Sequence, residues 1–174
     1  MRSKLVIILA LIVAGLLVFS ALAEDTKKEE APEYDYIGAK KCGLKPCHGK
    51  DGIMASWEET PHATAYDDLT DEQKADESLM KFYTTGTTKK GDVLTGVQCE
   101  ACHGPGSDYK SMSIMKDREK AIANGLLMPD EETCKGCHNA DAPGKLGESA
   151  EGFDFAKMME KGVHILPYSD EKGE

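Results

Sequence analysis

The chain has 174 residues, and the first 23 are predicted to be a signal peptide, because Arg2 and Lys4 precede an apolar run that ends in Ala21-Leu22-Ala23. Removing those two basic residues from 21 leaves 19 against 31 Asp and Glu, a net charge of about −12 that argues against a nucleic-acid-binding protein. The remaining length suits one domain, but only about a third of it is apolar. A chain this poor in apolar residues is disordered, cross-linked, or folded around another apolar body.

Two segments precede the predicted domain, which we expect over residues 38–174. Residues 1–23 are the signal peptide, which predicts export to the periplasm or the extracellular space. Its apolar run is long for a signal, and if uncleaved it would anchor the chain in a membrane. Residues 24–37 are charged and include a proline, which predicts a flexible leader.

Short helices are predicted along the domain, with minimal β structure. Their signals are cap residues, capping boxes and a terminal Asn-Gly pair, while a segment rich in Thr, Gly and Val predicts extended or hairpin structure. Helices are expected over about 51–57, from Pro61 after the cap Thr60, and from the capping box of Thr70 and Gln73 to about Phe82. Two more helices are expected over 107–123 and 153–164. The extended segment is expected over 84–97, a turn from Asp130, and a loop over 140–152.

The six cysteines form three close pairs, and a histidine follows each pair directly. Two pairs read C-x-x-C-H, the attachment signature of c-type haem, and the first pair has a spacer of four residues. In this chemistry the two thiols bond to the haem vinyl groups and the histidine is held under the iron as proximal ligand. The three motifs are Cys42, Cys47 and His48; Cys99, Cys102 and His103; and Cys134, Cys137 and His138.

A disulfide framework and a zinc site are the alternatives to haem attachment. Six cysteines suit a secreted disulfide framework, but that framework does not explain three histidines in the same relative position. In a zinc site, a histidine next to a ligating cysteine rarely reaches the same ion. We therefore expect three covalently attached haems and a mostly α fold, with short helices wrapped around the haem cluster. The porphyrins would then supply the apolar interior that the chain lacks.

The motifs and their flanking residues resemble the multihaem cytochrome c-554 family, the tetrahaem electron carriers that serve hydroxylamine oxidation in ammonia oxidisers. The similarity covers about residues 39–168 and includes the C-terminal helix with Phe155, Met158 and His164. Its clearest stretches are Lys40-Lys41-Cys42 with Cys47-His48, Ser56-Trp57-x-x-Thr60-x-His62-Ala63-x-Ala65, and Leu94-Thr95-Gly96-Val97-x-Cys99-Glu100-x-Cys102-His103-Gly104-Pro105-Gly106.

One haem site of the family has no counterpart in this chain. The family's second site should lie between Phe82 and Leu94, where there is no cysteine. In the family that haem is the five-coordinate one with an open iron face. The resemblance therefore implies a three-haem variant, and it lends less support to an enzymatic activity.

The distal iron ligands must come from few residues, because only His62 and His164 remain for three irons. The resemblance implies that His62 is a distal ligand, and we expect His164 to fold back over the haem cluster. We pair His62 with the haem of His103, and His164 with the haem of His138. The family places a distal histidine about ten residues after the histidine of the G-P-G motif, and here that position falls among Met112, Ser113 and Met115. We predict that Met112 or Met115 ligates the haem of His48 and favour Met112, with an open iron or a ligand from another chain as alternatives.

The predicted function is electron transfer between redox partners and not catalysis. The expected partners are other redox proteins, either a multihaem oxidoreductase or a quinol-linked cytochrome. Two alternatives remain. The protein would be a small haem reductase acting on a nitrogen oxide or hydroxylamine if the haem of His48 has an open iron face. It would be the self-assembling subunit of an extracellular filament if the next protomer supplies the missing ligand.

Overall fold

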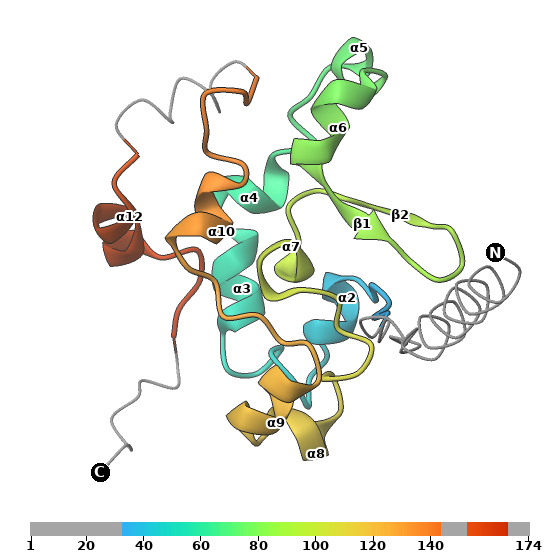
Figure 1. Ribbon diagram of the computed structural model, residues 1–174, viewed down its shortest axis with the longest axis vertical. Coiled ribbons are helices and arrows are strands. Elements are labelled where there is room, and N and C mark those ends of the chain that lie inside the picture. The colour runs from blue at the N-terminus through green and yellow to red at the C-terminus, as the bar shows by residue number, and fades with distance from the viewer. Residues whose placement is uncertain (1–32, 144–152, 167–174) are drawn as a thin grey trace, which may run out of the picture. The chain divides into compact units, whose positions relative to one another are not determined.

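A computed structural model describes residues 33–143 and 153–166 of the chain (Figure 1). The predicted signal peptide, most of the predicted leader and most of the predicted loop over 140–152 lie outside the described residues. Within the described residues the fold is mostly helical, with one two-stranded sheet, and this confirms the predicted fold class. No helix of this described part is long enough and apolar enough to cross a membrane.

The helices of the described residues have four to seven residues each, too short to be stable without packing partners. Helix α7 lies at the centre of the ribbon, with the others arranged around it (Figure 1). In chain order the helices are α2 (Ala39–Cys42), α3 (Ile53–Glu58), α4 (Pro61–Thr64), α5 (Asp71–Lys74), α6 (Glu77–Tyr83), α7 (Cys99–His103), α8 (Met112–Met115), α9 (Arg118–Ala123), α10 (Glu131–Lys135) and α12 (Phe155–Lys161).

Two helices predicted as continuous are each divided in two. The capping box of Thr70 and Gln73 is present, but α5 ends at Lys74, and the Asp76 carboxylate accepts a hydrogen bond from the Ser78 backbone N–H to begin α6. Capping carboxylates stabilise a helix start, so a second cap divides the segment. The predicted helix over 107–123 is wrong for the same reason, since Asp117 caps α9 through the Lys120 N–H at 3.1 Å.

The predicted extended segment is a β-hairpin that is tied to α7. Strand β1 (Thr84–Thr87) pairs antiparallel with β2 (Val93–Thr95), with an irregularity after Thr84. The buried Thr85 hydroxyl donates to the Gly96 carbonyl and accepts from the Gln98 N–H, each at 2.8 Å. Because Gln98 is the N-cap of α7, the hairpin positions the start of the second cysteine motif.

Residues 34–37, which we predicted to belong to the leader, are hydrogen-bonded to the domain. The Asp35 N–H donates to the Ser107 hydroxyl at 3.0 Å, so Ser107 binds this segment and does not cap a helix. The Glu100 carboxylate accepts backbone N–H bonds from Ile37 at 3.0 Å, from Gly38 at 2.6 Å and from Gly106 at 2.6 Å. The compact unit of the chain accordingly begins at Tyr34.

Few apolar side chains of the described residues are buried by protein atoms. Glu100, which is 1% exposed, is the largest fully buried side chain among them. The buried apolar residues are Ala39, Phe82, Tyr109, Ala121 and Ala142, whereas the large exposed ones are Leu44, Val93, Met112, Ile122, Leu127, Met128, Met158, Met159, Ile165 and Leu166. Soluble folded domains bury most such side chains, so protein atoms alone do not complete this interior.

Candidate haem-binding site

The first and third cysteine motifs place the histidine next to the first cysteine, and in the second motif Cys99 and His103 begin and end helix α7. In the third motif the His138 N–H donates to the Cys134 carbonyl at 2.9 Å. The first motif makes the equivalent bond, from the His48 N–H to the Cys42 carbonyl at 3.0 Å. Its longer spacer is taken up by a turn in which the Cys47 N–H donates to the Leu44 carbonyl at 2.8 Å. The wide spacing is therefore compatible with the geometry of the two shorter motifs.

The cysteines do not form the predicted alternative, a disulfide framework. All six lie in described segments, all are half-buried, and all are free thiols. Within the described residues there is also no group of three or more His, Cys, Asp or Glu placed to hold a metal ion such as zinc.

Thiols of different motifs lie close together. A hydrogen bond between the Cys42 and Cys99 side chains raises the pKa of Cys42 and lowers the pKa of Cys99. Burial raises the pKa of Cys102 to about 11, with smaller contributions from Cys134 and Cys137. The second motif is therefore adjacent to the first through one cysteine and to the third through the other.

Three imidazole rings are oriented by hydrogen bonds to Nδ1. The Nδ1 of His48 contacts Asp51 Oδ2 at 2.8 Å, that of His103 contacts the Leu127 carbonyl at 3.0 Å, and that of His164 contacts the Ile165 carbonyl at 2.8 Å. A carbonyl or carboxylate only accepts, so Nδ1 is the donor, and in the neutral ring Nε2 is then the nitrogen with a lone pair. This is the arrangement that orients a metal-ligating histidine.

The histidines form two pairs across the fold. The ring centres of His62 and His138 are 6.0 Å apart, and those of His103 and His164 are 6.1 Å apart. When two imidazoles bind one iron, each Fe–N bond is about 2 Å and each ring centre is about 1 Å further out, which gives about 6 Å between centres. Both pairs have this spacing. Our predicted pairing, of His62 with His103 and of His164 with His138, is the reverse of what the structure shows.

Burial favours the neutral form of three of the paired imidazoles, those of His62, His103 and His138. It is the main cause that lowers the pKa of His62, with the neighbouring His138 as the second cause, and it also lowers the pKa of His103 and His138. A neutral imidazole is the form that binds a metal ion.

The first motif differs from the other two, because no second imidazole of the described residues lies opposite His48 at such a distance. Met112, which we predicted to ligate this haem, begins α8 and is 47% exposed. Its role stays a prediction. A different methionine, Met54, packs against the motif: a Cβ added to Gly43 would lie 2.9 Å from its Sδ.

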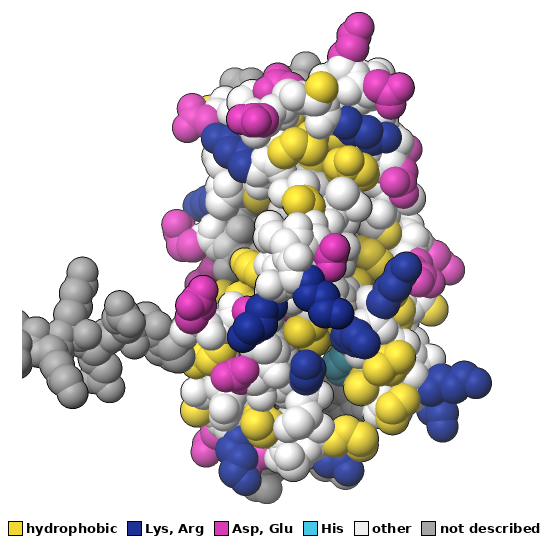
Figure 2. All heavy atoms as spheres, turned by 90° about the vertical axis from the view of Figure 1, so that its right-hand side faces the viewer, with side chains coloured by type: hydrophobic (Ala, Val, Ile, Leu, Met, Phe, Trp, Pro, Cys, Tyr) yellow, Lys and Arg dark blue, Asp and Glu magenta, His cyan; other side chains and the backbone are white. Residues whose placement is uncertain are grey.

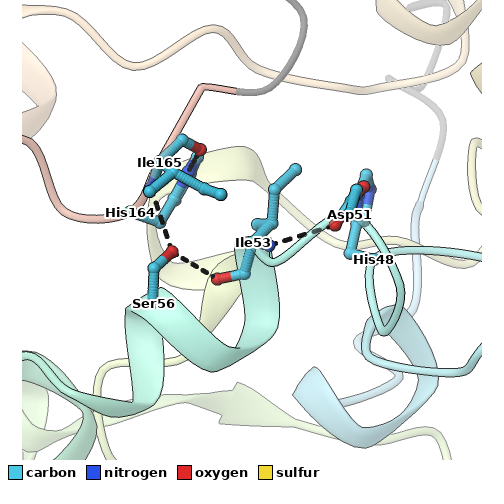
Figure 3. Close-up of polar contacts among 6 residues, drawn as sticks. All are labelled: His48, Asp51, Ile53, Ser56, His164 and Ile165. Carbon is cyan, nitrogen blue, oxygen red and sulfur yellow. Dashed lines mark hydrogen bonds and ion pairs between the residues drawn. The ribbon is translucent and has the colours of Figure 1, made fainter.

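A chain of polar contacts links His48 to the segment of His164 (Figure 3). The Asp51 carboxylate binds the His48 ring and accepts from the Ile53 N–H at 3.0 Å. The Ser56 hydroxyl donates to the Ile53 carbonyl and accepts from the Ile165 N–H, each at 3.0 Å. Helix α3 therefore holds both the proximal ring of the first motif and the C-terminal segment.

Two residues of the site, Glu100 and Asp51, were not predicted from the sequence. Glu100 stands inside the second motif, where a buried carboxylate has no sequence signal apart from the family resemblance. Asp51 had a weak local signal, an acidic residue three positions after a proximal histidine. The partners of both are set by folding.

The residues present fit haem. Two imidazole pairs have the spacing for one iron each, and the Nδ1 atoms of His48, His103 and His164 are hydrogen-bonded. Large apolar residues lie beside the second pair. The backbone carbonyls of Leu127 and Ile165 are its Nδ1 acceptors, and the side chains of both residues are exposed. A porphyrin would cover such side chains, which also accounts for the incomplete protein interior.

Comparisons with known proteins agree with this site. Residues 80–104 match the family described as Cytochrome c554 and c-prime. Cytochrome c-554 of Nitrosomonas europaea is 30% identical over 163 residues, which cover 74% of this chain and 68% of that protein. A solved structure, the reduced state of cytochrome c554 from Nitrosomonas europaea, has a similar fold with a TM-score of 0.54 and 22% identity, covering 77% of this chain and 86% of that one.

Proposed function

The chain belongs to the cytochrome c-554 family of multihaem c-type cytochromes, which act in electron transfer, and we propose that it is a three-haem electron carrier exported to the periplasm or beyond. The observation that carries the proposal is the pair of histidine contacts at 6.0 and 6.1 Å. Iron bound by two imidazoles has no free position for a substrate, so these two sites suit electron transfer and not catalysis.

The proposed ligand set assigns a role to each residue. The cysteine pairs of the three motifs hold the haems through thioethers, and His48, His103 and His138 are the proximal ligands. His62 is the distal ligand opposite His138, and His164 is the distal ligand opposite His103. Haem supplies an iron that alternates between the ferric and ferrous states. The chain contributes the imidazole orientation and the burial that tune its potential.

The contacts among the cysteines support a linear order of the three sites. Cys42 is hydrogen-bonded to Cys99, and Cys102 lies within electrostatic range of Cys134 and Cys137, which supports a second motif placed between the other two. In the proposed carrier, an electron that enters at the first or the third site reaches the opposite site through the haem of His103.

The proposal is tested by counting and characterising the haems of the purified protein. Mass spectrometry should give the mass of the mature chain plus three haems. Low-temperature EPR with near-infrared magnetic circular dichroism should show two haems with two histidine ligands each. Fewer than three haems, or a high-spin signal from either paired site, would contradict it.

The first site decides between a pure carrier and a reductase. We propose Met112 as its sixth ligand, which would complete three six-coordinate irons. A high-spin ferric signal that disappears on addition of nitric oxide would instead favour reduction of a nitrogen oxide or hydroxylamine at the haem of His48, because His48 has no opposite imidazole among the described residues. A third signal with two histidine ligands would require a histidine from another copy of the chain and would favour a filament.

A further inference from the structure

A basic surface surrounds the first cysteine motif of this acidic protein. Residues 36–50 contain four lysines and no Asp or Glu, although the whole chain has a net charge of −10. All four side chains are exposed, and none forms an ion pair with a carboxylate of the described residues. The lysines are Lys40, Lys41, Lys45 and Lys50, and we call them the motif lysines.

The turn of the β-hairpin extends this surface. A bridge between Tyr36 and Thr88 places the turn beside the segment that leads into α2. The turn adds the exposed Lys89 and Lys90, of which Lys89 is paired with Asp35 at 3.3 Å. Figure 2 shows Lys and Arg side chains gathered in the middle of the face that carries α2 and this turn.

Acidic side chains are concentrated elsewhere, at the end formed by α5 and α6 (Figures 1 and 2). Six exposed acidic residues occur in this part of the chain, and they are Asp67, Asp68, Asp71, Glu72, Asp76 and Glu77. The separation of charge is partial, because acidic side chains also border the basic ones in Figure 2 and the exposed Asp92 belongs to the same turn as Lys89 and Lys90. Such a charge distribution orients a protein before contact and directs one face toward a partner of opposite charge.

We propose that the motif lysines form the docking surface for an acidic redox protein that exchanges electrons with the haem of the first motif. The inference rests on the proposed three-haem function. The lysines flank Cys42 and His48 directly in sequence, and the His48 side chain is 30% exposed, so a partner held by them reaches the first site before the other two. An acidic protein fits better than an anionic lipid surface, because a lipid surface does not exchange electrons.

The test uses the haem-loaded protein and a gold electrode coated with a carboxylate-terminated monolayer as the anionic probe. The adsorbed mass is recorded with a quartz crystal microbalance, which does not depend on haem chemistry, and voltammetry then records the electron exchange. One variant replaces the four motif lysines with Gln. The control variant has the same net charge and replaces four exposed lysines outside this surface, Lys116, Lys120, Lys135 and Lys157.

We expect the wild-type protein and the control variant to adsorb at about 10 mM salt, where the screening length is about 30 Å, and to be released at about 1 M salt. The variant lacking the motif lysines should adsorb at least about tenfold less. Equal adsorption of the two variants, or no adsorption of the wild type, would overturn the proposal. The two variants could also adsorb equally while the reduction potentials of the variant lacking the motif lysines differ in solution from those of the wild type. That result would indicate that the lysines interact with the carboxylates of the haem, and it would also overturn the proposal.

Two controls separate this proposal from the proposed function. Voltammetry at a neutral, hydroxyl-terminated monolayer tests reversible electron transfer without docking, and its failure would contradict the carrier function alone. Cosedimentation with phosphatidylglycerol vesicles tests the lipid alternative. Vesicle binding that requires the motif lysines, without electron exchange at the carboxylate electrode, would reassign the surface to a membrane and overturn the proposal.

Discussion

The imidazole rings of His103 and His164 lie with their centres 6.1 Å apart, and each ring has its Nδ1 hydrogen-bonded to a backbone carbonyl. Both Nε2 atoms therefore keep a lone pair, and the spacing suits a single iron between them. His62 and His138 repeat the spacing at 6.0 Å. These two pairs define the ligand assignments of the proposed function, and each assignment can be tested separately.

Replacing a distal histidine should open one iron. His164→Ala and His62→Ala should each convert one low-spin ferric haem to high-spin, and the reduced proteins should each bind one carbon monoxide. EPR and carbon monoxide titration measure both effects.

The pairing itself is tested in a Cys134→Ala/Cys137→Ala background, which cannot attach the third haem. There His62→Ala should create no new high-spin haem, because its partner haem is absent, while His164→Ala should still create one. A new high-spin signal from His62→Ala in that background would restore the pairing that we predicted from the sequence.

Met112→Ala should affect the first haem alone. Loss of a thioether ligand removes the charge-transfer band of methionine-ligated ferric haem and lowers the potential of one haem by on the order of 0.1 V. Visible spectroscopy and a potentiometric titration record both changes. Met115→Ala, on the same short helix, is the matched control. If Met112→Ala behaves like this control, Met112 is not the ligand.

Glu100→Gln should destabilise the domain without removing a haem ligand. The buried carboxylate accepts N–H bonds from Ile37, Gly38 and Gly106, and the amide group of Gln would turn a donor toward one of these donors. We expect a loss of about 1–3 kcal/mol in the free energy of unfolding, measured by denaturant titration of the haem-loaded protein. Glu119→Gln makes the same charge change at an exposed position. Equal effects of the two substitutions would show that the Glu100 contacts contribute little.

The cap of α10 should be sensitive to acid. Hydrogen bonds from the Thr133 backbone N–H and hydroxyl lower the pKa of Asp130 below its ordinary value of 3.8. A lowered folded-state pKa means that the stabilisation is complete above the ordinary value and is lost as the pH falls through the folded-state value. Asp130→Asn keeps a capping oxygen that does not titrate. Thermal unfolding between about pH 2 and pH 7 should therefore show a smaller loss of stability in acid for Asp130→Asn than for the wild type.

Asp67 is exposed and is not the N-cap of a described helix, so it offers a control. Asp67→Asn should leave the acid dependence of unfolding as it is in the wild type. Parallel pH profiles for the wild type and Asp130→Asn would contradict the role of the Asp130 cap.

Local signals in the sequence predicted the structure best. The capping box of Thr70 and Gln73 and the hairpin over 84–97 are present, because each depends on residues close together in the chain. The turn predicted from Asp130 is wrong, since Asp130 and Thr133 form a capping box that begins helix α10. The helix predicted from Ser107 is absent because the Ser107 hydroxyl binds the Asp35 N–H, a partner 72 positions away. No periodic pattern in the sequence predicts a contact between residues so far apart in the chain.

The features of the candidate site likewise divide into those predicted from local signals and those that depend on distant contacts. Motif spacing identified the cysteines and their histidines, since the chemistry of attachment is itself local. The ring contacts differ from those expected from the sequence, since His62 lies beside His138 and His103 beside His164, and such contacts depend on how segments from different parts of the chain pack. Glu100 was missed because burial of its carboxylate depends on three backbone N–H groups, and two of them, from Ile37 and Gly38, lie 63 and 62 positions away.

The hydrogen bond from the Ile165 N–H to the Ser56 hydroxyl joins segments 109 positions apart, and it has a consequence for the order of assembly. A protein exported from its N-terminus delivers all three cysteine motifs before residue 164. Under the proposed ligand set, the iron at His103 is therefore accessible from its distal side until the C-terminal segment docks on α3. A chain that ends before His164 would therefore give a cytochrome that can still be reduced but whose iron at His103 is reactive and binds gases.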